Sequence, residues 1–168
     1  DWEGAYLNEA ALEAMSELRR ELGKAPLTHF VCPAYFTQRG ANPEWAPAIK
    51  AQIVPGDEVG LHIHSWFSLA ERAGVVPRRE PNFFGDTQSL MEFESGDLGF
   101  EIPLSAYDAA EIEKIVESSH SLLEERGLGE ARSFRAGGYA ADPKVLSAIA
   151  KAGMTVDSSA TWPQWFEE

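Results

Sequence analysis

Short runs of alternating apolar and polar residues mark the strands that this chain is expected to form. The clearest run is 56–66, Gly-Asp-Glu-Val-Gly-Leu-His-Ile-His-Ser-Trp, in which Val59, Leu61 and Ile63 alternate with glycine and histidine. This alternation predicts a strand that is entered from a Gly-Asp turn. Shorter apolar runs predict three more strands, at 27–32, 132–136 and 154–157.

Between the strands, apolar residues recur every three or four positions, which predicts amphipathic helices. The first helix covers 8–22, with Asn8 as its N-cap and Gly23 as its C-terminal stop. Its expected buried stripe comprises Leu12, Met15, Leu18 and Leu22. Three further helices are expected: a short one opened by Asn42-Pro43, a long one at 106–126 capped by Ser105 or Asp108, and one opened by Asp142-Pro143 and ended by Gly153.

Strands that alternate with amphipathic helices indicate a parallel α/β architecture. At 168 residues, of which 44% are hydrophobic, the chain has the size of a single domain with its own core, so 1–168 is expected to be one domain. The exception to the regular pattern is 68–105, which is too long and irregular for an ordinary connection between a strand and a helix. This segment is expected to be a lid or a binding loop, in which Phe83-Phe84 either stacks on a ligand or fastens the loop to the body.

Two histidines of the central strand are the first candidates for chemistry. His62 and His64 occupy alternate positions, so their side chains share one face of the strand and lie close enough to hold one metal ion. Neutral imidazole is the commonest protein ligand for metals and suits zinc and other divalent transition ions. The motif is short, and two histidines that face other side chains or water satisfy it as well. Of the other two histidines, His29 is expected to be packed or hydrogen-bonded in its strand, and His120 to be exposed on its helix.

Polar residues also stand at the ends of other expected strands. Asp1 and Glu3 are carboxylates at alternate positions, and Arg135 and Asp157 each close a strand. In a βα barrel the carboxyl ends of the strands form the rim on which active sites are built, so these placements, together with the histidine pair, favour a single site. No strand residues precede Asp1, which indicates that a first strand is missing from this sequence; a solvated chain end is the alternative explanation.

Charge and cysteine content narrow the classes of partner. A net charge of −13 and a pI near 4.7 argue against nucleic acid or an anionic membrane surface as a partner. No stretch resembles a signal peptide or a membrane span. The acidity weakly favours a location outside the cytoplasm, and nothing in the sequence indicates the oligomeric state. Cys32 is the only cysteine, so an internal disulfide is excluded and a buried structural thiol is expected.

Four stretches resemble the polysaccharide deacetylase family (NodB-like, carbohydrate esterase family 4). The run 58–66, Glu-Val-Gly-Leu-His-Ile-His-Ser-Trp, resembles the metal-binding histidine motif of the family, and Phe-Arg-Ala-Gly-Gly-Tyr at 134–139 resembles its arginine motif. The stretch 145–159, which ends in Ala-Gly-Met-Thr-Val-Asp-Ser-Ser, is similar to the helix and strand that follow. Asp-Trp-Glu-Gly at 1–4 is similar to the opening acidic motif, in the form with one residue between the two carboxylates.

The resemblance implies a distorted (β/α) barrel that is incomplete at both ends in this chain. It also implies an enzyme that hydrolyses acetyl groups on a glycan, with N-acetyl groups expected before O-acetyl groups. It implies that Glu3, His62 and His64 hold one divalent metal ion, with zinc expected first and cobalt, nickel or manganese as alternatives. By the same resemblance, Asp1 is the general base and Arg135 orients it.

The chain departs from the family pattern at three points. The second histidine ligand of the family lies four residues after the first, where this chain has Trp66, so His64 has to replace it. Gly137-Gly138 stands in place of the usual proline after the arginine. The acid histidine, which Asp157 would orient, normally comes from a later strand than those in this sequence. Trp66 and Tyr139 are candidates to stack on a sugar ring, although core packing explains Trp66 almost as well.

Two other functions fit part of the pattern. A non-catalytic carbohydrate-binding relative of the same fold would tolerate these departures. A different metal-dependent barrel hydrolase, of the amidohydrolase type, also begins with two histidines at a strand end. That type needs further histidine ligands at later strand ends, where this chain offers only the helical His120. The leading prediction is therefore a metal-dependent deacetylase that acts on an acetylated glycan.

Overall fold

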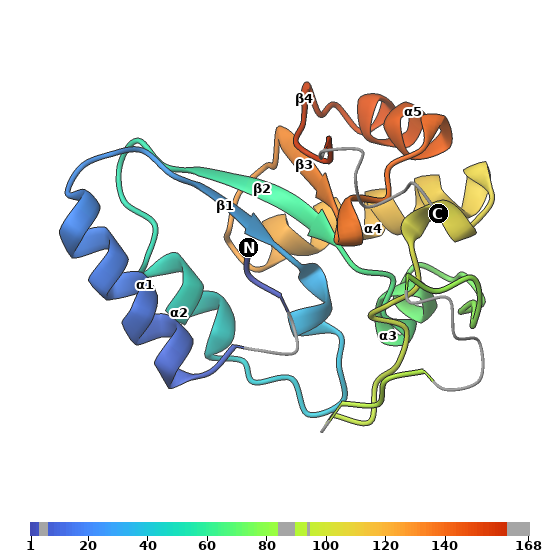
Figure 1. Cartoon of the computed structure of the whole chain (residues 1–168), viewed down its shortest axis with the longest axis horizontal. Helices are drawn as coiled ribbons and strands as arrows, with labels where there is room; N and C mark the ends of the chain where they lie inside the picture. The colour runs from blue at the N-terminus through green and yellow to red at the C-terminus, as the bar shows by residue number, and fades with distance from the viewer. Residues whose placement is uncertain (4–6, 84–89, 94, 161–168) are drawn as a thin grey trace.

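A parallel β-sheet with helices packed around it forms the centre of the molecule (Figure 1). The computed structural model describes residues 1–3, 7–83, 90–93 and 95–160. The strands are β1 (Thr28–Val31), β2 (Glu58–Ile63), β3 (Ser133–Ala136) and β4 (Val156–Asp157). The helices are α1 (Glu9–Leu22), α2 (Trp45–Lys50), α3 (Phe67–Arg72), α4 (Ala109–Glu125) and α5 (Pro143–Lys151), with 3-10 turns η1 (Pro33–Phe36), η2 (Leu104–Ala106) and η3 (Gly137–Tyr139). The predicted α/β class is confirmed.

The four strands lie in the order of the chain, β1-β2-β3-β4, and every pair is parallel. Their carboxyl ends therefore meet at one edge of the sheet, as the sequence pattern requires. The first residues extend this order, because the Trp2 N–H donates to the Phe30 carbonyl at 2.7 Å and the Cys32 N–H donates to the Trp2 carbonyl at 2.8 Å. A sequential parallel order is the order of a β/α barrel, and closure of such a barrel stays a prediction.

The two faces of the sheet have different characters. One face packs with α4 in the hydrophobic core. Its core residues are Val31, Leu61, Ile63, Phe134 and Ala136. The register pairs Phe30 with Gly60 and His62 with Arg135, so strand alternation places these four residues on the opposite face. There Phe30 lies so close to Gly60 that a Cβ at this glycine would come within 2.6 Å of the phenylalanine ring. The Arg135 guanidinium covers the same ring at 4.2 Å from its centroid. This second face carries the polar candidate residues.

Local capping explains where the helices begin. The Asn8 side chain accepts a hydrogen bond from the Ala11 N–H at 2.9 Å, as predicted for the N-cap of α1. Of the two caps expected for α4, Asp108 is the one used, and it forms a reciprocal capping box with Glu111. Asp142 caps α5, and Pro143 occupies its first turn. Within the described residues, no helix has both the length and the apolar character that a membrane span requires.

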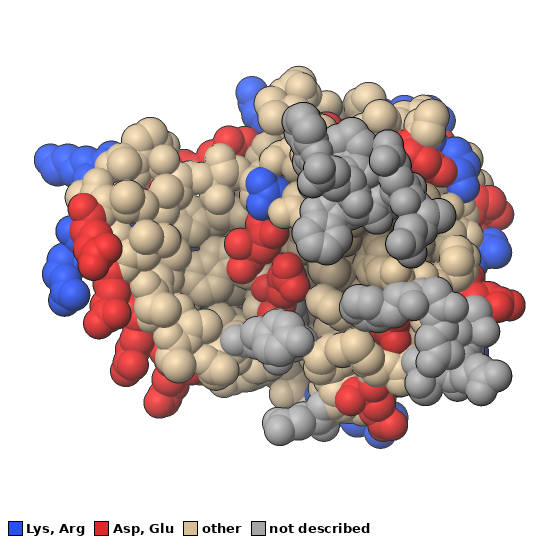
Figure 2. Space-filling view, viewed as in Figure 1, with Lys and Arg blue, Asp and Glu red and all other residues tan. Residues whose placement is uncertain are grey.

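The structure corrects the expected burial of α1. None of its residues is buried, and Leu18 and Leu22 are 45% and 43% exposed, although Leu12 and Met15 pack partly against the core. The reason is the position of α1 at the edge of the sheet (Figure 1). Its inner face borders an open groove, which Ala11, Ala14, Met15 and Leu18 help to line. Figure 2 shows charged side chains along the outer side of this edge, whereas the surface between it and the middle of the molecule is largely uncharged.

Two smaller expectations also change. His120, expected to be exposed, is half-buried, and its Nε2 lies 3.2 Å from the Ala131 carbonyl oxygen. The segment 68–105 is not entirely irregular, since α3 covers its first residues and η2 its last. The helix expected after Asn42-Pro43 is shorter than predicted and begins only at Trp45.

Candidate metal centre

Three side chains converge at the carboxyl edge of the sheet. Glu3, His62 and His64 each offer one ligand atom, and these atoms lie within 4.8 Å of one another. The Nε2 atom of His62 is 3.5 Å from Glu3 Oε1, and that of His64 is 3.8 Å from Glu3 Oε2. Within the described residues the buried Nε2 of His62 has no hydrogen-bond partner. Three ligand atoms that surround one point at these distances leave room for a cation between them.

The second nitrogen of each ring fixes how the imidazoles are presented. His62 Nδ1 lies 2.8 Å from the Arg135 carbonyl oxygen, and His64 Nδ1 lies 2.7 Å from the Phe100 carbonyl oxygen. A carbonyl oxygen can only accept, so each Nδ1 carries the proton, and in a neutral ring each Nε2 keeps its lone pair. Ligating histidines in proteins commonly donate their other N–H to a carbonyl group, which holds the ring in place. Both histidines therefore have the tautomer and the support of metal ligands.

The charge states suit the same purpose. Burial, followed by the proximity of His62, lowers the pKa of His64 to about 4, so this ring is neutral at pH 7. The nearby His62 ring lowers the pKa of the Glu3 carboxyl more than burial raises it. The pKa therefore lies below its usual range and Glu3 is ionised. One carboxylate and two imidazoles that bind through Nε2 form a donor set that zinc accepts, and three protein ligands leave a position open for water or substrate.

Aromatic side chains from 68–105 enclose His64. The Phe100 ring stacks on the His64 ring with a centroid distance of 4.0 Å and an interplanar angle of 9°. Phe83 meets the His64 ring edge-on at 6.4 Å, and it lies so close to Gly138 that a Cβ there would come within 2.4 Å of it. The neighbouring Phe84 lies outside the described residues. This part of the segment thus forms a wall of the site, and Phe83 is fastened to the body of the protein.

Arg135 and Asp1 lie next to the three ligands. Arg135 Nη1 donates to Asp1 Oδ1 at 2.8 Å. The same guanidinium donates through Nη2 to the Ser158 Oγ at 2.8 Å and through Nε to the Ser158 carbonyl at 3.3 Å. With its flat side on Phe30, Arg135 is held from three directions and presents one N–H to Asp1. The structure thus brings together the pair that the sequence resemblance placed in contact.

The remaining candidates lie in different surroundings. Asp157, at the exposed end of β4, accepts hydrogen bonds from the Ser159 N–H at 3.2 Å and the Ser159 hydroxyl at 2.6 Å. Tyr139 is 44% exposed at the rim, with a φ of 59° and the Arg135 guanidinium 5.8 Å from its ring centroid. Its ring is open to a ligand.

Trp66 was expected as a second residue that stacks on sugar, and this expectation is wrong. Its side chain is fully buried and packs against Phe93 and Phe100, with ring centroids 4.8 and 5.4 Å away. Both phenylalanines come from 68–105, so this segment turns Trp66 into a core residue. The position at which the resemblance would place a second histidine ligand is therefore occupied by a structural side chain.

Gly137 is a site residue that the sequence showed only as half of a glycine pair. A Cβ at this position would come within 2.7 Å of the His64 ring and of the Ile63 carbonyl oxygen. Real Cβ atoms do not approach other atoms so closely, so only glycine allows His64 to occupy its observed position. The carbonyl of Phe100, which orients His64, had no signal in the sequence.

Substitution of Gly137 by alanine is therefore expected to displace the His64 ring and to weaken metal binding by about 10-fold or more, the cost typical of a lost partner of a ligand. Competition with a chromophoric chelator measures this affinity. Gly153→Ala is the matched control: its Cβ meets no atom within 4 Å, and its φ of +87° makes alanine costly only for stability. Equal metal affinity in the two variants would contradict the role of Gly137.

Comparison with known proteins supports the fold. No protein-family model and no curated protein matches the chain. A solved structure, a family 4 carbohydrate esterase from Streptomyces lividans in complex with acetate, matches with a TM-score of 0.54 and 14% sequence identity. The match covers 89% of this chain and 56% of the esterase, so the chain spans little more than half the length of that protein. The chain therefore has the fold of a family 4 carbohydrate esterase, the family whose motifs its sequence resembles.

Proposed function

We propose that the protein is a metal-dependent hydrolase that removes acetyl groups from an oligosaccharide or polysaccharide. N-acetyl groups are the first expectation. The observation that carries this proposal is the cluster of Glu3, His62 and His64, whose histidine Nε2 atoms face the carboxylate while both Nδ1 atoms are held by carbonyl oxygens. The similar structure supports it, since that protein is a carbohydrate esterase in complex with acetate, the product of acetyl hydrolysis.

The residues present fit a divalent ion, and zinc is the first expectation from the donor set. When bound, the ion would supply Lewis-acid chemistry that polarises the acetyl carbonyl and acidifies water. Glu3, His62 and His64 would hold it. Asp1 accepts the proton of the attacking water, and Arg135 fixes one oxygen of Asp1 so that its carboxylate keeps a single orientation. The exposed Tyr139 ring would contact the sugar, and a backbone N–H near it would donate to the developing oxyanion.

The substitution Asp1→Asn is expected to lower kcat for acetate release by 10²–10⁴-fold, the typical contribution of a positioned general base. Its metal content is expected to equal that of the wild type, because Asp1 is not one of the three ligands. Acetate release is measured with protein loaded with zinc, cobalt, nickel or manganese. N-acetylated chito-oligosaccharides and O-acetylated xylo-oligosaccharides distinguish the two kinds of acetyl group.

Two outcomes would contradict the proposal. Full activity in Asp1→Asn would remove Asp1 from the reaction. A wild-type protein that binds metal and oligosaccharide but releases no acetate from either substrate would overturn the enzyme assignment in favour of a carbohydrate-binding relative of the same fold.

A further inference from the structure

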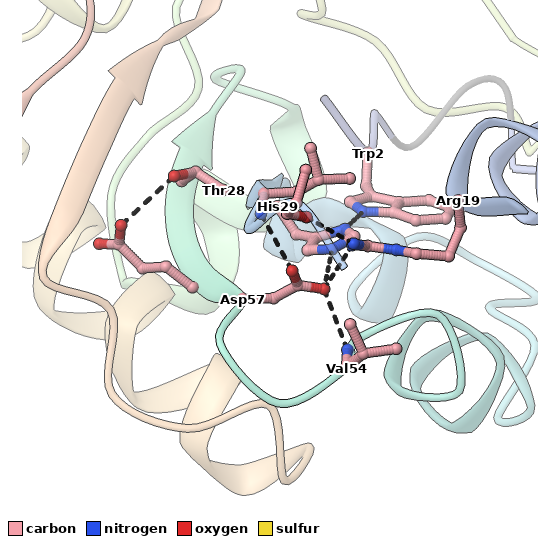
Figure 3. A network of polar contacts seen from close by, with 9 residues as sticks. Trp2, Arg19, Thr28, His29, Val54 and Asp57 are labelled. Atoms are coloured by element: carbon pink, nitrogen blue, oxygen red, sulfur yellow. Dashed lines mark hydrogen bonds and ion pairs between the residues drawn. The ribbon is translucent and has the colours of Figure 1, made fainter. Parts of the chain in front are cut away.

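A chain of buried polar side chains starts in the acidic segment, residues 1–3, and runs through Trp2, His29 and Asp57 (Figure 3). The register pairs Trp2 with Val31 and His29 with Val59, which puts both rings on the side of the sheet opposite the metal site. Trp2 lies between Asp1 and Glu3, so strand alternation turns its indole away from the two carboxylates. Trp2 is 7% exposed, and its indole Nε1–H donates to His29 Nδ1 at 3.1 Å. The two rings are nearly parallel, with an interplanar angle of 19°. Trp2 thus links the candidate ligand Glu3 to a residue in the middle of β1.

The direction of each hydrogen bond in this chain is fixed. An indole N–H can only donate, so His29 Nδ1 accepts and the imidazole proton resides on Nε2. His29 Nε2 therefore donates to Asp57 Oδ2, which is 3.1 Å away. A ring with protons on both nitrogens would turn an N–H toward the indole N–H. The observed arrangement thus holds His29 in one tautomer and one orientation.

Asp57 is the fixed end of the chain. Its side chain is fully buried just before β2 begins, and its Oδ1 accepts the Leu27 N–H at 2.9 Å. Its Oδ2 accepts the Val54 N–H at 3.0 Å and Arg19 Nη2 at 2.6 Å, in addition to His29. Two backbone groups and two side chains from separate elements therefore leave this carboxylate no freedom to rotate.

The acidic segment needs such an anchor because it pairs with the sheet through one bridge. Trp2 and Val31 form this bridge, and two backbone hydrogen bonds support it. The Tyr35 hydroxyl also donates to the Glu3 carbonyl oxygen. Because Asp1 and Glu3 project from the face opposite the indole, a rotation of Trp2 about the strand axis would move both carboxylates relative to His62 and His64.

We propose that Trp2, His29 and Asp57 are positioning residues that set the Asp1 and Glu3 carboxylates against the histidine pair. They act on metal affinity through the orientation of Glu3, and none of them is a ligand. The proposal rests on the proposed function, since it requires Glu3 to bind the ion. It differs from ordinary packing because the indole N–H, rather than the bulk of the ring, is the group that orients the segment.

The test measures cobalt affinity by absorbance titration of the wild type and of variants that remain folded by circular dichroism. Trp2→Phe keeps a large aromatic ring but loses the N–H, and it is expected to bind cobalt about 10-fold more weakly, in the range found for partners of ligands. His29→Leu is expected to behave alike. His29→Gln offers both an acceptor for Trp2 and a donor for Asp57, and it is expected to restore most of the affinity.

The matched control is Tyr107→Phe, which removes one hydrogen bond from a buried aromatic residue that lies away from the acidic segment. It is expected to lower stability while cobalt affinity stays at the wild-type value. If Trp2→Phe and His29→Leu bind cobalt as tightly as the wild type, the inference is overturned and the network only stabilises the fold. Failure of the wild type itself to bind cobalt, zinc, nickel or manganese would instead overturn the proposed function, and this inference with it.

A measurement on the wild type covers the case in which Trp2→Phe does not fold. Nitrogen chemical shifts of His29 are expected to report a proton on Nε2, and the Trp2 indole N–H resonance is expected to shift as zinc is added, because binding fixes the neighbouring Glu3. A proton on His29 Nδ1, or an indole resonance that zinc leaves unchanged at saturation, would overturn the positioning role.

Discussion

Substitution of His64 by alanine is expected to remove metal binding and, with it, acetate release. The loss should exceed the roughly 10–100-fold that follows when only a partner of a ligand is changed, because a ligand itself is missing. His64 is the informative ligand, since the family pattern expects a histidine where Trp66 is buried in the core. Metal content by elemental analysis and affinity by chelator competition give the result directly.

His120→Ala is the matched control for this substitution. Like His64, His120 is largely shielded from solvent and has a ring nitrogen next to a carbonyl oxygen, that of Ala131. Unlike His64, it is not part of the metal cluster. Its replacement is expected to leave metal content unchanged. His62→Ala is expected to lose metal as His64→Ala does, with the fold intact. One equivalent of tightly held metal in His64→Ala would show that the ligand set is wrong.

Much of the fold could be predicted because its signals are local. The N-caps Asn8 and Asp142 and the alternation in β2 depend only on residues near them in the chain, and the structure confirms them. The burial of α1 could not be predicted in the same way. An apolar stripe such as Leu18 and Leu22 shows which face of a helix can be buried, whereas what covers that face is decided by distant parts of the chain.

The candidate site likewise has features that could be predicted from nearby residues and features that could not. Strand alternation predicted that His62 and His64 share a face, and they converge with Glu3. The contacts that shape the site join segments far apart in the sequence. Phe100 lies 36 residues from the His64 ring that it orients, and the need for glycine at position 137 arises from the approach of that ring and of the Ile63 carbonyl oxygen, both far from Gly137 in the sequence. Trp66 was misread for the same reason, because the aromatic residues that bury it come from the irregular segment.

Asp57 had no motif to draw attention to it, and its substitution by asparagine is expected to cost about 3–5 kcal/mol of stability, as for other broken buried ion pairs. An asparagine of the same shape offers one acceptor oxygen and directs an N–H toward groups that are themselves donors. Asp142→Asn is the matched control. Asparagine caps helices as well as aspartate does, so this change is expected to stay within about 0.5 kcal/mol of the wild type.

The pH dependence separates a lost charge from a lost shape. Burial alone would raise the pKa of Asp57, but the backbone N–H groups of Val54 and Leu27, with His29 and Arg19, lower it below its usual range. A carboxyl whose pKa is lower in the folded than in the unfolded state stabilises the fold above the unfolded pKa of about 3.9, and this contribution declines as the pH falls below that value. The stabilities of wild type and Asp57→Asn, measured by urea unfolding, should therefore differ most near pH 7, and the difference should shrink as the pH falls below about 4 toward the lower pKa of the folded protein. A difference under about 1 kcal/mol at pH 7, or one that grows on acidification, would show that the ionised carboxylate does not stabilise this edge of the sheet.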